Sequence, residues 1–110
     1  MVKIQINSNQ AHHLTLIINE LATNSMKYAF GSRDEANITI DFHQHESSLT
    51  IVFRDDGPGY SEKILKDDFK LSSIGFELIK GIVRRSLNGT VDFGNDEGAF
   101  ASIVFNNELH

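Results

Sequence analysis

The chain has 110 residues, 40% of them hydrophobic and 23% charged, a composition typical of a single soluble globular domain. Its formal net charge of −5 opposes binding to nucleic acid, because a phosphate backbone demands a basic surface. The absence of cysteine and of an apolar N-terminal stretch favours a cytoplasmic domain without direct membrane contact. This expectation is compatible with a longer parent protein that is anchored in a membrane.

The first half of the chain predicts a strand, a long helix and a hairpin. Apolar and polar residues alternate over residues 2–6, as in a half-buried strand, and residues 7–9 break the pattern. Apolar residues then recur at helical spacing over residues 10–30, and Gly31 follows as a helix-ending residue. Alternation returns over residues 38–42 and 49–53, with a polar turn between them, which predicts an antiparallel hairpin.

The second half predicts a loop, a helix and two strands. Residues 55–71 are rich in charge and glycine and form the long loop. Ser72 or Ser73 can cap a second helix, and two strands follow around a turn at residues 95–98. Five strands and two main helices indicate an α+β fold, a two-layer α/β sandwich, with residues 1–110 as one domain.

Three segments carry residues that suggest chemistry. On the first helix, Glu20, Asn24 and Lys27 follow one another at i, i+4 and i+7 and form a polar stripe beside the apolar face. A carboxylate, an amide and an ammonium so placed could orient a nucleophile, ligate a hard cation and pair with phosphate. When the stripe is taken alone, an ordinary solvated helix flank is the more common explanation.

The second segment, Asp55-Asp56-Gly57-Pro58-Gly59-Tyr60, directly follows a predicted strand. Such residues usually form only a turn. Alternatively, a carboxylate at the end of a strand can accept a hydrogen bond from an exocyclic amine, and neighbouring glycines allow a flat base to approach.

The third segment, residues 72–79, places small residues where a helix begins. Free N–H groups there favour anionic oxygens, although simple capping by serine also accounts for the pattern.

Taken together, these segments resemble the GHKL (Bergerat-fold) ATPase superfamily, which includes gyrase, the Hsp90 chaperones, histidine kinases and MutL. Residues 16–30, Leu-Ile-Ile-Asn-Glu-Leu-Ala-Thr-Asn-Ser-Met-Lys-Tyr-Ala-Phe, are similar to its asparagine box. Asp55-x-Gly57-x-Gly59 resembles the first glycine box, and Ser-Ile-Gly-Phe-Glu-Leu-Ile at residues 73–79 the second. Glu97-Gly98-Ala99 resembles a Gly-Thr signal with alanine in place of threonine. Histidine kinases with a short ATP lid show the most similar motifs.

The resemblance implies a mixed, mostly antiparallel sheet packed against two or three helices, with ATP and Mg²⁺ as cofactors. It implies that Asn24 ligates Mg²⁺, that Glu20 lies beside the γ-phosphate and that Lys27 pairs with phosphate. It further implies that Asp55 accepts a hydrogen bond from the adenine amino group. The remaining residues of the implied nucleotide site are Tyr28, Gly57, Gly59, Ser73 and Gly75.

The implied activity is transfer of the γ-phosphate to a histidine on a separate dimerisation domain, and from there to a response regulator. None of the five histidines has a phosphoacceptor context, and the pairs His12-His13 and His43-x-His45 lack the further ligands of a zinc site. We expect a monomeric domain from a longer histidine kinase.

Two alternatives remain open on the sequence alone: a serine kinase of the anti-sigma-factor type, and a degenerate interaction module. The intact motif residues oppose the degenerate module. Ser73 and Phe76, which depart from the usual glycine and leucine, keep it open, since either could partly close the phosphate loop.

Overall fold

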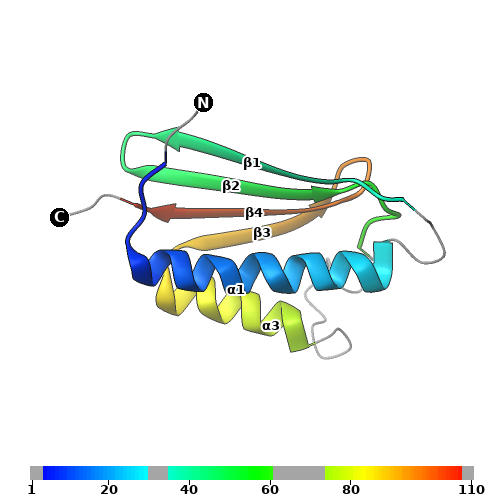
Figure 1. Ribbon diagram of the computed structural model, residues 1–110, viewed down its shortest axis with the longest axis horizontal. Helices are drawn as coiled ribbons and strands as arrows, with labels where there is room; N and C mark the ends of the chain where they lie inside the picture. The colour runs from blue at the N-terminus through cyan, green and yellow to red at the C-terminus, as the bar shows by residue number, and fades with distance from the viewer. Residues whose placement is uncertain (1–3, 30–34, 61–73, 108–110) are drawn as a thin grey trace.

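Two helical segments cover one face of an antiparallel sheet (Figure 1). The computed structural model describes residues 4–29, 35–60 and 74–107, with the backbone alone at Tyr28, Ala29, Ile74 and Gly75. Within these residues the helices α1 and α3 lie side by side beneath the sheet, and no helix covers its other face. The predicted α+β fold with two layers is confirmed.

The first helix begins earlier than predicted. α1 (Ser8–Asn24) continues as a wider, π-helical segment, η1 (Ser25–Ala29). Asn7, expected only to end the alternating pattern, caps the helix. Its side chain accepts a hydrogen bond from Gln10 N at 2.8 Å, and the Gln10 side chain accepts one from Asn7 N at 3.2 Å. This reciprocal capping box satisfies two backbone donors that a helix start otherwise leaves open.

The sheet contains β1 (Ile38–His45), β2 (Ser48–Asp55), β3 (Thr90–Asn95) and β4 (Ala99–Asn106), in the order β1-β2-β4-β3. Every second residue of β2 is buried, because successive side chains of a strand point to opposite faces. The alternation that buries Phe53 therefore also buries Asp55, the last residue of the strand. The buried side of β2 faces the helices.

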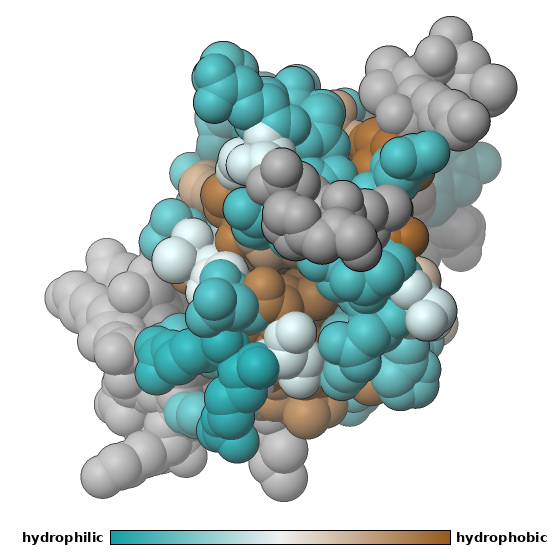
Figure 2. All heavy atoms as spheres, turned by 90° about the vertical axis from the view of Figure 1, so that its left-hand side faces the viewer, coloured by the Kyte–Doolittle hydropathy of each residue, from teal (hydrophilic) through white to brown (hydrophobic). Residues whose placement is uncertain are grey.

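The second helical segment completes the lower layer with α3 (Ile74–Gly81) and η3 (Ile82–Ser86). The core fills the space between the layers. Its buried residues are Leu14, Ile17, Leu21, Leu49, Ile51, Phe53, Ile79, Ile82, Val83, Leu87, Ala101, Ile103 and Phe105. Viewed from the end at which α1 begins, hydrophobic atoms show between hydrophilic side chains (Figure 2). None of the helices in the described part of the chain is long and apolar enough to span a membrane.

The sheet differs from the prediction at its N-terminal end. Residues 4–6 of the predicted strand at 2–6 join no strand, and residues 2 and 3 lie outside the described ranges. Ile4 and Ile6 pack against the core, and Gln5 O accepts a hydrogen bond from Asn107 Nδ2 at 3.0 Å. The alternation here reflects side-chain packing without a strand partner. The described sheet accordingly has four strands and is antiparallel throughout, not mixed.

Candidate functional site

Asp55 is a buried carboxylate that three separate segments hold in place. The residue is 9% exposed, and its Oδ2 accepts a hydrogen bond from Ser25 Oγ at 2.9 Å. Its Oδ1 accepts from Gly57 N at 3.0 Å and from Ala99 N at 3.2 Å. A buried carboxylate is costly unless its oxygens are hydrogen-bonded, and these donors fix the orientation of both oxygens.

Asn24 lies next to this arrangement and carries an unsatisfied donor. It is 6% exposed, and its Nδ2 has no hydrogen-bond partner among the described residues. Such a donor costs about 1–3 kcal/mol when it is left buried and unpaired. The helix changes from α to π at this point, between Asn24 and Ser25, and short π segments are frequent at functional sites. The Asn24 amide is therefore available to a ligand.

The turn between β3 and β4 approaches the backbone of Asp55. Gly98 has φ of +137°, and a Cβ at this position would lie 2.0 Å from Asp55 O. Only glycine fits here, because both the dihedral angle and the space exclude a side chain. The following residue, Ala99, donates its backbone N–H to the carboxylate. The segment that resembles a Gly-Thr signal thus contributes a backbone donor.

Gly59 and Asn95 fix the segment that follows β2. Gly59 has φ of +89°, and a Cβ there would lie 2.6 Å from Asn95 Oδ1. The Asn95 side chain accepts a hydrogen bond from Tyr60 N at 2.7 Å and donates one to Tyr60 O at 3.0 Å. The glycine permits this close approach, and the amide ties the segment to the end of β3.

Three aromatic rings pack edge to face beside this segment. The ring centroids lie 5.4 Å apart for Tyr60 and Phe76, 5.8 Å for Tyr60 and Phe93, and 5.2 Å for Phe76 and Phe93. Phe76, bulkier than the leucine usual at this position, is 1% exposed and fills the interior. Burial, and to a smaller degree the negative charge of Asp55, raises the pKa of Tyr60 above its ordinary value.

Two polar residues of the predicted stripe flank Asn24 along the helix. Glu20 is half-buried and Lys27 is exposed. In the part of the chain that the structure describes, neither forms an ion pair with another side chain, which leaves both charges available to a ligand.

The remaining predicted residues are placed only in part. Tyr28 belongs to η1 and Gly75 to α3, each described by its backbone, and Ser73 lies outside the described residues. Ser25, the residue after Asn24, donates a hydrogen bond to Asp55, and Gly57 donates its backbone N–H to the same carboxylate, whereas Gly59 approaches Asn95.

The histidine pairs form no cluster of metal ligands. His12 and His13 pack ring to ring with centroids 5.2 Å apart, and His13 Nδ1 lies 2.8 Å from Asn9 O. Among the described residues no group of three or more His, Cys, Asp or Glu side chains could hold a metal ion.

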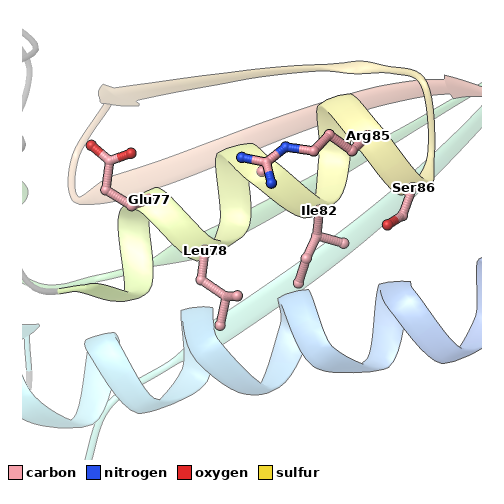
Figure 3. A pocket seen from close by; sticks show the side chains of 6 residues that line it. Glu77, Leu78, Ile82, Arg85 and Ser86 are labelled. Carbon is pink, nitrogen blue, oxygen red and sulfur yellow. The ribbon is translucent and has the colours of Figure 1, made fainter.

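A groove of about 200 Å³ runs along the second helical segment, and its lining includes none of the predicted site residues. Leu78 and Ile82 point from this segment toward α1, and Glu77 lies at the opposite end of the groove from Ser86 (Figure 3). The groove is lined by Glu77, Leu78, Gly81, Ile82, Arg85 and Ser86.

The residues around Asp55 and Asn24 fit a nucleotide with Mg²⁺. A half-turn of the Asn24 amide about its last torsion exchanges its oxygen and nitrogen, so it can offer either an oxygen to a cation or an N–H to a phosphate. Mg²⁺ suits such a site because it keeps several waters and takes few protein oxygens. A fixed, buried carboxylate with acceptor capacity left suits an amino group on a base.

Ser25 and Ala99 lie within the motif segments and donate hydrogen bonds to Asp55, although neither was among the predicted site residues. Ser25 lies on the apolar side of the predicted helix, and a buried hydroxyl requires a hydrogen-bond partner. Its position in the sequence therefore indicated that Ser25 has a polar partner. Ala99 contributes only its backbone N–H, and the identity of its side chain does not predict that contribution.

Comparison with known families and proteins identifies what the chain is similar to. The family described as "Histidine kinase-, DNA gyrase B-, and HSP90-like ATPase" matches residues 9–109. The chain is 28% identical over 87 residues to the sensor histidine kinase PdtaS of Mycobacterium tuberculosis, covering 78% of this chain and 17% of that protein. It is 27% identical over 62 residues to the serine-protein kinase RsbW of Listeria innocua, covering 56% of this chain and 40% of that protein. The chain thus spans less than half the length of these relatives.

Solved structures share the fold. The histidine kinase domain of the blue-light activated histidine kinase EL346 from Erythrobacter litoralis superposes with a TM-score of 0.79 at 18% identity, covering 96% of this chain and 48% of that one. The ATP binding domain of PrrB from Mycobacterium tuberculosis gives a TM-score of 0.71 at 18% identity, covering 89% of this chain and 69% of that one.

Proposed function

Because the chain belongs to the family of histidine kinase-, DNA gyrase B-, and HSP90-like ATPases, we propose that it binds ATP with Mg²⁺ and donates the γ-phosphate to a histidine. The histidine lies on a separate dimerisation domain, from which the phosphate passes to an aspartate of a response regulator. Phosphoryl transfer requires mainly positioning and charge neutralisation, which a domain without the acceptor residue can supply.

One observation carries this proposal: a buried carboxylate with fixed orientation is hydrogen-bonded to Ser25, and the residue before Ser25 is a buried amide with an unpaired donor. Asp55 is held by three hydrogen bonds, and Asn24 Nδ2 has no partner in the described residues. A purely structural pair would be expected to satisfy its own polar atoms, since an unpaired buried donor is destabilising. The arrangement thus supports the proposal of a ligand that brings both a donor and anionic oxygens.

The other predicted residues then have distinct roles. Lys27 pairs with a phosphate, and Glu20, one turn before Asn24, lies beside the phosphate that reacts. Gly75, near the start of α3, places its helix N–H group against phosphate oxygens, and Ser73, outside the described residues, is assigned to the same phosphates. Tyr28 packs near the base, and Gly57 and Gly59 shape its pocket. Bound Mg²⁺ neutralises phosphate charge, with Asn24 as its protein ligand.

A serine kinase is the second candidate, and the similarity to the serine-protein kinase RsbW favours it. In that case the partner presents a serine hydroxyl, and the same nucleotide site serves the reaction. The two candidates differ in the product: phosphohistidine is hydrolysed in acid, whereas phosphoserine survives acid.

Titration calorimetry of ATP into the chain, with and without Mg²⁺, tests the nucleotide site. We expect Mg²⁺-dependent binding that Asp55→Asn and Asn24→Ala abolish. The controls are Asp92→Asn and Asn19→Ala, which alter exposed residues of the same kinds on β3 and on α1 and should bind like the wild type. Absence of binding at high ATP would instead favour a degenerate interaction module.

Radiolabelled ATP then tests the acceptor. The chain is incubated with a histidine-bearing dimerisation domain or with a serine-bearing partner, and the labelled partner is treated with acid. Label lost in acid supports the histidine kinase, and label retained supports the serine kinase.

A further inference from the structure

The two oxygens of Asp55 differ in how many hydrogen bonds they can still accept. An ionised carboxylate has about four acceptor positions, two on each oxygen. Gly57 N and Ala99 N occupy both positions of Oδ1, at 3.0 and 3.2 Å. No acceptor position on Oδ1 remains for a ligand.

Ser25 occupies one of the two positions of Oδ2. The hydroxyl lies 2.9 Å from this oxygen, and Ser25 is 4% exposed, so little water can compete for the interaction. The hydrogen bond also fixes the rotation of the carboxylate about its last torsion. Asp55 is left with one open acceptor position, next to the hydroxyl of Ser25.

We propose that Ser25 is a positioning residue that makes the site select a 6-amino purine over a 6-oxo purine; this inference rests on the proposed binding of ATP. One open acceptor position suits the single donor of an exocyclic amine, as on adenine. A 6-oxo purine presents an acceptor at that place, which repels the carboxylate. Recognition of guanine through its neighbouring N1–H and N2–H donors requires an open position on each oxygen, and Oδ1 has none.

The test measures the affinity of the Mg²⁺ complexes of three nucleotides by calorimetry: ATP, inosine triphosphate with a 6-oxo group, and purine riboside triphosphate with hydrogen at position 6. The wild type is expected to bind ATP most tightly. Ser25→Ala should weaken ATP roughly fivefold, the effect of one net hydrogen bond, and leave the other two unchanged. Ser25→Thr, which keeps the hydroxyl, should retain the preference for ATP.

The matched control is Thr15→Ala. Thr15 Oγ1 donates a hydrogen bond to Ala11 O at 2.8 Å on the same helix, away from Asp55, and its loss should change none of the three affinities. Thermal melting of each variant without nucleotide checks that the fold is retained.

Asp55→Asn gives a second, independent arm. Its Oδ1 should remain toward Gly57 N and Ala99 N, so its Nδ2 faces the base and offers a donor. The preference should invert, with inosine triphosphate bound more tightly than ATP.

The outcomes separate this inference from the function on which it rests. If the wild type binds none of the three nucleotides, the proposed function fails. If it binds all three alike, the nucleotide site stands and the selectivity is overturned. If Ser25→Ala weakens all three equally, Ser25 supports the fold without positioning Asp55, and the inference is again overturned.

Discussion

Ala99 N reaches Asp55 Oδ1 at 3.2 Å across 44 residues of sequence, and Gly98 is the residue that permits this approach. Gly98→Ala would place a Cβ 2.0 Å from Asp55 O at a dihedral angle that side chains rarely adopt. We expect the free energy of unfolding to fall by about 1–3 kcal/mol, measured by urea denaturation, and ATP binding to weaken because Asp55 loses a donor.

Gly81→Ala is the contrasting control for that experiment. Gly81 has helical dihedral angles, and its Cβ would lie 3.4 Å from the flexible end of Arg85. The free energy of unfolding should rise by about 0.5–1 kcal/mol, as for other glycine-to-alanine changes in helices. Equal losses in both variants would mean that Gly98 is not specially constrained.

Asn24→Leu should stabilise the chain and abolish nucleotide binding. The buried Nδ2 lacks a partner among the described residues, so an apolar side chain of similar shape removes a cost of about 1–3 kcal/mol. Urea denaturation without nucleotide measures the gain, and calorimetry the loss of ATP binding. Asn19→Leu, on an exposed position of α1, should change stability by less than about 0.5 kcal/mol. An unstable Asn24→Leu chain with intact binding would contradict the assignment of Asn24 to the ligand.

Tyr60 should make the fold sensitive to alkaline pH. Burial and the charge of Asp55 raise the pKa of Tyr60 in the folded chain above the value near 10 that tyrosine has when unfolded. Stability from the neutral phenol is complete below pH of about 10, and falls above it because only the unfolded chain then releases the proton. Denaturation midpoints between about pH 8 and 11 should decline more steeply for the wild type than for Tyr60→Phe. Parallel declines would mean that the phenol ionises equally in both states.

Asn107 should stabilise the end of the sheet through a pair of side-chain amides. Its Nδ2 donates to Gln44 Oε1 at 2.7 Å and to Gln5 O at 3.0 Å, and its Oδ1 accepts from Gln44 Nε2 at 2.9 Å. Asn107→Ala should lower the free energy of unfolding by about 0.5–1.5 kcal/mol, because the buried Asn107 amide loses its hydrogen bonds to the exposed residues Gln44 and Gln5.

A double-mutant cycle with Gln44→Ala measures the coupling between these amides. We expect about 1 kcal/mol, in the range usual for residues in direct contact, with ATP affinity unchanged in each variant. Strictly additive losses would show that the two amides act independently.

Much of the fold follows from periodicity in the sequence. The helix that ends at Asn24, the hairpin of β1 and β2 and the pair β3 and β4 were all predictable because their buried residues recur at regular spacing. The same alternation predicts that Asp55 shares the buried face of β2. Alternation cannot tell a paired strand from an extended segment packed by its side chains, which is why residues 4–6 of the predicted strand at 2–6 join no strand in the described part of the chain.

The candidate site was predictable only in its motif residues. Ser25 and Asp55 are 30 residues apart, and no local pattern encodes a hydrogen bond over that separation. The donor from Ala99 belongs to the backbone, so it depends on where the turn at Gly98 places the chain. Hydrogen-bond partners that are distant in sequence follow from tertiary packing, so local sequence patterns do not predict them.

The distribution of the donors to Asp55 ties ligand binding to the folding of the whole domain. Ser25 and Ala99 lie on segments that meet Asp55 only when both layers have formed, so a partly unfolded chain loses the oriented carboxylate. A nucleotide that binds through Asp55 then stabilises the folded state alone, by about 2.7 kcal/mol at a concentration one hundred times its Kd. The thermal midpoint of the domain would consequently track the concentration of its own substrate, and a rise in melting temperature with ATP becomes a direct readout of occupancy.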